Sequence, residues 1–378
     1  MKSLGIAGIA GSLVLFVATS TVSKCDVLPT SLLREFQDFQ DDSAFGIVAR
    51  QGRREEIDAR LEASLRGPAP GWGERRNVPA LASFLLTGGD PAFARKAVAL
   101  MPRDAADMSL VQNALVYADE ESPQAARKLE AADLRAVSPE VAGVLALVQA
   151  KLAMEHDRKV ASEKLAAARI LAPGGLIEEA ALRQELFILD GETDFDTIRR
   201  IVGRYFSRFG RSAYIENFVQ RLEVLSEQGW TSKSSESRTK AARIIEEAPI
   251  ATRSRLALRM ARVSLMRGHR AAARQALQIG CTDLPAGAGV EERCALYRQI
   301  EEASDPGKAR DDTTLPQWPA SRLGDDDRLL LECAKLLRAH VETVKVAEPS
   351  GAERHDTETM RRIKGSVVEA EQLLAGTR

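Results

Sequence analysis

The sequence has 378 residues, of which 53 are Lys or Arg and 54 are Asp or Glu, and its formal net charge is −1. This balance excludes the strongly basic surface of a dedicated nucleic-acid-binding protein. Hydrophobic residues make up 44% and charged residues 28% of the chain, which excludes intrinsic disorder and a membrane protein with many spans, and the 5% of aromatic residues indicates a helical rather than a β-rich chain.

The first residues have the pattern of an export leader. Lys2 is followed by an apolar run over residues 4–18, which Ser12 alone interrupts, and small residues come next. This order predicts a secretory signal peptide over residues 1–23, cleaved after Ser23. The alternative is an uncleaved N-terminal anchor, which would be the protein's only contact with a membrane. The sequence does not decide between removal and retention of the leader.

Helical periodicity dominates the chain after the leader. Residues 141–152 carry an apolar stripe with helical spacing, and the next helix places Ala161, Leu165 and Ala168 on one face before it stops at Pro173. Small residues at 161 and 168 let two antiparallel helices approach closely, as in the second half of a tetratricopeptide repeat. Weaker copies occur elsewhere, at roughly the 34-residue period of such repeats. We therefore predict an all-α fold, a degenerate tetratricopeptide-like array of helical hairpins (an α-solenoid).

Clusters of proline, glycine, serine and lysine divide the predicted array into segments. The expected segments are the leader (1–23), an N-terminal helical-repeat lobe (28–225), a linker (226–239), a second helical lobe (240–303), an irregular segment (304–327) and C-terminal helices (328–378).

The four cysteines are interpreted in light of the predicted export. Cys281 and Cys294 flank a turn-rich stretch that can fold back on itself, so we predict a disulfide between them. Cys25 and Cys333 then either pair with each other or stay free. No C-x-x-C pair and no nearby histidine accompanies the cysteines, which argues against a metal site.

The sequence lacks the common motifs of catalytic and cofactor sites. No two of its four histidines lie three or four residues apart, and it contains neither a nucleophile motif nor a phosphate-binding loop. Glu178 and Glu179 could indicate a hydrolase, but Glu179 is also spaced to pair with Arg183 on one helix. The aspartates at 325–327 could bind calcium weakly or cap a helix that begins at Arg328. We expect no catalytic residue, no cofactor and no enzymatic activity.

A row of arginines beside an apolar helical stripe is the most distinctive local feature. The candidate partner-binding residues are Arg200, Arg204, Arg208, Arg211 and, in the next predicted helix, Tyr214. The arginines follow one another at intervals of four, four and three residues, which lines them along one helical edge. This edge is either a solvated helix face or a docking strip for an acidic partner segment or a cell-wall carboxylate, because guanidinium groups bind carboxylates in bidentate fashion.

The region around this row resembles a known family. Residues 173–185 (PGGLIEEAALRQE) and 204–214 (RYFSRFGRSAY), with residues 86–91 (LTGGDP) and 33–37 (LREFQ), look like the MotC family of periplasmic motility proteins of α-proteobacteria. The resemblance runs from about residue 28 to residue 346. It implies an exported helical protein of the periplasm that acts in chemotaxis and flagellar rotation with the periplasmic region of the stator protein MotB. It implies no catalytic residues.

Two other functions stay open at this stage. The same array and leader suit a periplasmic helical-repeat adaptor for envelope or cell-wall assembly. A cell-wall hydrolase would require Glu178 or Glu185 to lie buried in a deep pocket. The sequence identifies neither the surface that binds a partner nor the oligomeric state.

Overall fold

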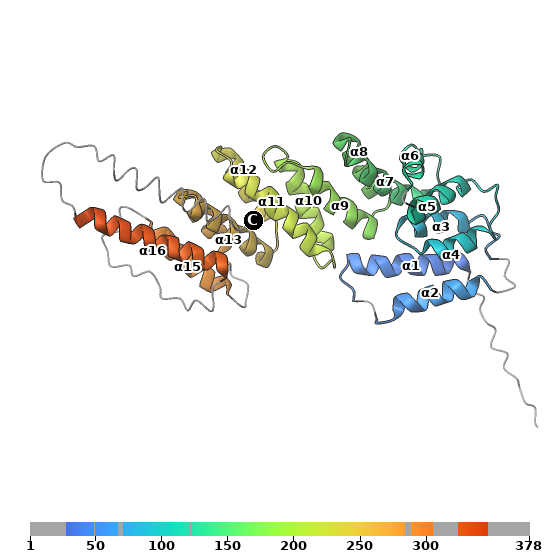
Figure 1. Ribbon diagram of the computed structural model, residues 1–378, viewed down its shortest axis with the longest axis horizontal. Coiled ribbons are helices and arrows are strands. Elements are labelled where there is room, and N and C mark those ends of the chain that lie inside the picture. Colours follow the sequence, from blue (N-terminus) through green and yellow to red (C-terminus); the bar gives the residue numbers. More distant parts are fainter. Residues whose placement is uncertain are drawn as a thin grey trace, which may run out of the picture. The chain divides into compact units, whose positions relative to one another are not determined.

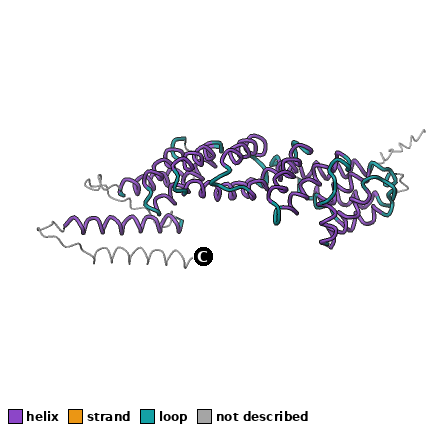
Figure 2. Tube along the Cα trace, turned by 90° about the horizontal axis from the view of Figure 1, so that it is seen from above, coloured by secondary structure: helices purple, strands orange, loops and turns teal. Residues whose placement is uncertain are grey.

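The computed structural model describes residues 28–48, 50–66, 71–120, 122–283, 289–304 and 324–346. Helices form all the regular secondary structure of these residues, joined by short turns and loops, and no strand occurs among them (Figure 2). The predicted all-α class is therefore confirmed, and the finer tetratricopeptide-like assignment stays a prediction. The leader, Cys25 and most of the irregular segment lie outside the described residues. No helix within the described ranges is long and apolar enough to cross a membrane.

The chain forms two compact units, residues 1–248 and 249–378, which are described separately. The helices of the first unit are α1 (Pro29–Ala44), α2 (Arg53–Ser64), α3 (Asn77–Leu86), α4 (Pro91–Val98), α5 (Met108–Glu120), α6 (Pro123–Glu130), α7 (Pro139–Ala153), α8 (Arg158–Leu171), α9 (Leu176–Ile188), α10 (Phe195–Phe209), α11 (Ile215–Thr231) and α12 (Ser235–Glu246) (Figure 1). Those of the second unit are α13 (Ile250–Met266), α14 (Arg270–Gly280), α15 (Val290–Ala303) and α16 (Asp325–Val346).

The hairpin of α7 and α8 follows directly from its sequence. Ala161, Leu165 and Ala168 of α8 are completely buried, as their common face predicts. The carboxylate of Asp157 begins α8 by accepting hydrogen bonds from the backbone N–H groups of residues 159 and 160, at 3.0 Å each. At Gly143 of α7 an added Cβ would lie 2.5 Å from the Cβ of Ala172, so the small residue permits the close approach of the two chain segments.

Aromatic side chains fill the N-terminal part of the first unit. The rings of Phe36, in α1, and Phe84, in α3, have centroids 4.7 Å apart. Phe93, in α4, contacts both Phe84 and Trp72 edge-on, with centroid distances of 5.6 Å. All four rings are buried, and rings in such tilted contacts add to the stabilisation that area burial gives. This cluster joins α1, α3 and α4.

Helices cover most of the segment predicted as a linker, residues 226–239. α11 continues to Thr231, and α12 begins at Ser235, where the hydroxyl of Ser234 accepts a hydrogen bond from the N–H of Ser237 and caps the helix. Trp230 is buried, and Gly229 lets its helix pass close to the carbonyl oxygen of Gly191, which lies 2.6 Å from the position of an added Cβ. Ser234, in the predicted linker, is therefore a helix cap, and the two units divide between residues 248 and 249.

The second unit is a smaller group of helices with its own polar contacts. Cys281 and Cys294 form a disulfide with an S–S distance of 2.06 Å, which joins the end of α14 to the start of α15. Cys333 is free and exposed. α16 begins at Asp325 rather than at residue 328, so the aspartates form its first turn, and Asp327 accepts a hydrogen bond from the hydroxyl of Tyr297.

Candidate partner-binding groove

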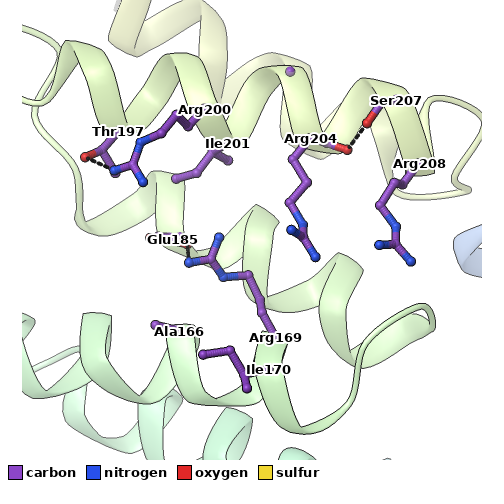
Figure 3. Close-up of a pocket in the computed structure, with 11 residues that line it drawn as sticks. Ala166, Arg169, Ile170, Glu185, Thr197, Arg200, Ile201, Arg204, Ser207 and Arg208 are labelled. Carbon is purple, nitrogen blue, oxygen red and sulfur yellow. Dashed lines mark hydrogen bonds and ion pairs between the residues drawn. The ribbon is translucent and has the colours of Figure 1, made fainter.

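An open groove of about 640 Å³ lies among α8, α9 and α10 in the first unit. Its charged and apolar lining includes Arg169 and Ile170 from α8, Glu185 from α9, and Arg200, Arg204 and Arg208 from α10. Figure 3 shows α8 and α10 on opposite sides of the groove, with the side chains of Arg204 and Arg208 pointing from α10 toward the opposite side. We call this set of six residues the arginine groove.

The strong amphipathicity of α10 orients its arginines. Ile198, Val202, Tyr205 and Phe209 are completely buried on one face of the helix. Their spacing of three and four residues is that of a single apolar stripe, which leaves the arginines at the intervening positions along its edge. The aromatic ring of Tyr205 stacks on that of Phe218, in α11, with centroids 3.7 Å apart. Packing on α11 therefore fixes the rotation of α10 about its own axis.

Glu178 neutralises part of the positive charge of the arginines on α10. Its carboxylate is completely buried and accepts a hydrogen bond from Nε of Arg204 at 2.7 Å, while Nη2 of Arg204 lies 2.5 Å from the same oxygen. Nη2 of Arg208 lies 3.5 Å from the other oxygen, which also accepts a hydrogen bond from the N–H of Gly174 at 2.6 Å. Arg204 and Arg208 are thus partly neutralised within the protein.

The neighbouring Glu179 belongs to a separate buried network. The predicted pair with Arg183 is present, with distances of 3.2 and 3.3 Å between guanidinium nitrogens and carboxylate oxygens. The hydroxyl of Tyr205 donates a hydrogen bond to Glu179 at 2.7 Å, and the hydroxyl of Ser212 does so at 3.4 Å. Burial and the adjacent carboxylate raise the pKa of the Tyr205 hydroxyl well above its ordinary value. The two adjacent glutamates therefore have different partners and do not converge on one point.

Glu185 is the carboxylate that faces the arginine groove. It is 5% exposed, and its Oε2 lies 3.4 Å from Nη2 of Arg169. Neither this oxygen nor Nε of Arg169 has a hydrogen-bond partner among the described residues. Burial raises the pKa of Glu185, and the charges of Arg169 and Arg200 oppose that shift.

This arrangement bears on the hydrolase alternative. Glu185 is buried and lines the groove, but that alternative requires a deep pocket and the groove is open. The second carboxylate is not in place, because Glu185 is the only acidic residue among those that line the groove in the described structure. Glu178, the other candidate, is buried behind the guanidinium groups of Arg204 and Arg208. The groove brings opposite charges together, and its geometry does not place two carboxylates on either side of a substrate bond.

Replacing Glu185 with glutamine is expected to stabilise the protein near neutral pH and to lose this advantage in acid. The pKa of Glu185 in the folded state is raised above the usual 4.5, so its ionised carboxylate destabilises the wild-type protein at neutral pH. This destabilisation disappears as the pH falls and the carboxylate is protonated. Urea denaturation at about pH 7.5 and about pH 5 measures the difference in the free energy of unfolding between the variant and the wild type. A difference that widens toward low pH would contradict the assignment.

Some of the partner-binding residues predicted from the sequence line the groove and others do not. It brings Arg200, Arg204 and Arg208 into the groove, whereas Arg211 and Tyr214 lie outside its lining. Arg211 follows the end of α10, and the ring of Tyr214 lies under the guanidinium group of Arg183, 4.9 Å from the ring centroid.

Sequence reasoning missed Arg169, in α8, as a site residue, and considered Glu185 only for a hydrolase. Neither residue lies in the row along α10. Their place in the groove depends on the packing of three helices, so no spacing within one helix could have indicated it.

No group of three or more His, Cys, Asp or Glu side chains in the described parts of the chain is arranged to hold a metal ion. His156, in the turn between α7 and α8, lies 2.9 Å from a carboxylate oxygen of Glu130.

Comparison with known proteins gives one match. The family model described as chemotaxis protein MotC matches residues 2–373. No curated protein and no solved structure matches the chain.

Proposed function

The chain belongs to the family of chemotaxis protein MotC, and from this premise we propose that it is a non-catalytic periplasmic scaffold that binds the exported region of the flagellar stator protein MotB. The match over residues 2–373 is the observation that carries the proposal, because it spans nearly the whole chain and relates it to motility and chemotaxis. The leader predicted over residues 1–23 motivates the periplasmic location.

The fold supports a scaffold role through its accessible surfaces. Stacked helices present extended surfaces on which a partner segment can lie, and such surfaces commonly bind other macromolecules. In the first unit the arginine groove is one such surface, open to solvent and rich in groups that bind carboxylates. Within it, the buried carboxylate of Glu185 lies 3.4 Å from the guanidinium group of Arg169.

Deletion of the gene is expected to abolish swimming while flagella are still assembled. The physical reason is that a missing stator-binding scaffold would impair torque generation and leave filament assembly intact. Swimming in soft agar and electron microscopy of the filaments measure the two properties. Restoration by the wild-type gene in trans is the control, and normal swimming of the deletion strain would refute the proposal.

Binding is tested by a pull-down with the exported region of MotB. The wild-type protein should retain it, whereas an unrelated exported helical protein should not. Failure of the wild-type protein to retain the exported region would remove MotB as the partner. Normal swimming together with a defect in cell shape or wall integrity would instead favour the adaptor for envelope assembly.

A further inference from the structure

We propose that the arginine groove binds an extended acidic peptide segment of a protein partner, and that a carboxylate of this segment displaces Glu185 from Arg169. The inference rests on the proposed function, which it deepens by naming the surface and the chemistry of the partner segment. It makes Arg169 and Arg200 the principal binding residues and leaves Arg204 and Arg208 in a supporting role.

The balance of charge in the groove favours an anionic ligand. Four guanidinium groups line it, and the carboxylates within reach of them are Glu185 and the buried Glu178. Glu178 is fully engaged by Arg204, Arg208 and a backbone N–H, so it leaves part of their charge uncompensated. Partly enclosed charges of one sign attract counter-charges more strongly than the same charges in free solution.

The contact between Glu185 and Arg169 is incomplete, and this second observation points to a ligand. Glu185 is 95% buried because its exposed fraction is 5%, yet its Oε2 has no hydrogen-bond partner among the described residues. The same is true of Nε of Arg169, although the two side chains form an ion pair at 3.4 Å. Figure 3 shows that they point toward each other inside the groove. A carboxylate with bidentate geometry would satisfy Arg169 better than Glu185 does.

Arg200 is the residue of α10 with the most available charge. Its Nε donates to the backbone carbonyl of Asp196 at 3.4 Å, and its Nη2 donates to the hydroxyl of Thr197 at 3.2 Å. Both contacts are weak, neutral and within the first turns of α10, so a carboxylate can replace them without disturbing another helix.

The spacing of the arginines favours an extended peptide over a compact anion. Arg200, Arg204 and Arg208 are four residues apart, which corresponds to about 6 Å along a helix axis. Every second side chain of an extended peptide lies on one face, at intervals of about 6.6 Å. Ile170, which is 77% exposed, offers an apolar contact beside these charges. A segment in which acidic and aliphatic residues occur together matches this lining.

Fluorescence anisotropy tests the proposal with a labelled peptide that alternates Glu with Val. The wild-type protein should bind it, bind the Gln–Val counterpart at least tenfold more weakly, and lose affinity as salt is added. Arg200→Glu should weaken binding about tenfold or more, whereas Glu185→Gln should tighten it severalfold because it removes the competing carboxylate. Arg211→Glu makes the same change of net charge outside the groove lining and should alter binding less than twofold.

Several outcomes would overturn the proposal. Equal binding of the Glu and Gln peptides would exclude charge recognition, and equal losses in Arg200→Glu and Arg211→Glu would assign binding to the general basic surface. Binding of purified cell-wall sacculi, lost in Arg200→Glu, without binding of the peptide would assign the groove to a wall carboxylate. Thermal unfolding checks that each variant is folded, and Arg200→Ala serves as a second variant if Arg200→Glu is unfolded.

The failure of this inference can be told apart from the failure of the proposed function. If the wild-type protein and Arg200→Glu retain the exported region of MotB equally, the groove is not its binding site and the partner assignment stands. If the wild-type protein binds the acidic peptide and does not retain MotB, the groove stands and the partner assignment falls.

Discussion

Replacing Glu179 with alanine is expected to lower the free energy of unfolding by about 3–5 kcal/mol, because the change leaves buried groups without their common acceptor. Glu179 is completely buried, and it accepts hydrogen bonds from Arg183, Tyr205 and Ser212. The Arg183 side chain is 19% exposed, so its charge would be left in a largely desolvated place. These contacts join α9 to α10 and to the turn after it, and their loss should loosen one wall of the arginine groove.

Urea denaturation of the variant and the wild type measures this effect. Glu163→Ala removes an exposed carboxylate from α8 and should change the free energy of unfolding by no more than about 0.5 kcal/mol. Glu179→Gln keeps an acceptor of the same shape and should cost less than the alanine variant. A loss below about 1 kcal/mol for Glu179→Ala would mean that the network contributes little to stability.

Replacing Gly46 with alanine should destabilise the protein by about 3 kcal/mol or more, because left-handed strain and a backbone clash act together. Gly46, in the turn after α1, has a φ of +69°, and an added Cβ would lie 1.8 Å from the carbonyl oxygen of Arg211. The adjacent hydrogen bond from the N–H of Ala213 to the carbonyl of Ser43, at 2.9 Å, shows that the two turns pack backbone to backbone. Neither turn can move without losing this contact.

Gly52→Ala is the matched control for this prediction. Gly52 has a φ of +79°, and nothing lies within 4 Å of an added Cβ, so the variant carries the left-handed strain without the clash. It should cost about 1–2 kcal/mol. Chemical denaturation of both variants separates the cost of the left-handed strain from that of the clash. Equal losses in the free energy of unfolding would show that the turn after α1 moves to accommodate the new methyl group.

The Glu179 network and the turn at Gly46 both help to hold the groove in place. The Glu179 network fixes α10 against α9 from within, and the turn at Gly46 supports the end of α10 from outside. The carboxylate of Asp41, in α1, also accepts a hydrogen bond from the N–H of Leu176 at 2.6 Å, which ties α1 to the start of α9. Burial raises the pKa of Asp41 despite this hydrogen bond.

The sequence by itself determined the features that depend on spacing along one helix. The apolar stripe of α8 and the pair of Glu179 with Arg183 each involve residues within one or two turns, and helical geometry places such residues side by side. The all-α class follows from the same periodicity repeated along the chain. The family resemblance added motility to this interpretation, and the family match supports it.

Only the tertiary structure decided which charges meet between different helices. Glu178 and Arg204 are 26 residues apart, and Arg169 and Glu185 come from neighbouring helices, so their contacts exist because α8, α9 and α10 pack together. In the folded chain Trp230 is also buried, and a stretch whose composition predicted a linker is largely helical. Local hydrogen bonds and side-chain periodicity determine which segments form helices. The burial of apolar faces determines which helices pack against one another. A charged site built across three helices depends on this packing.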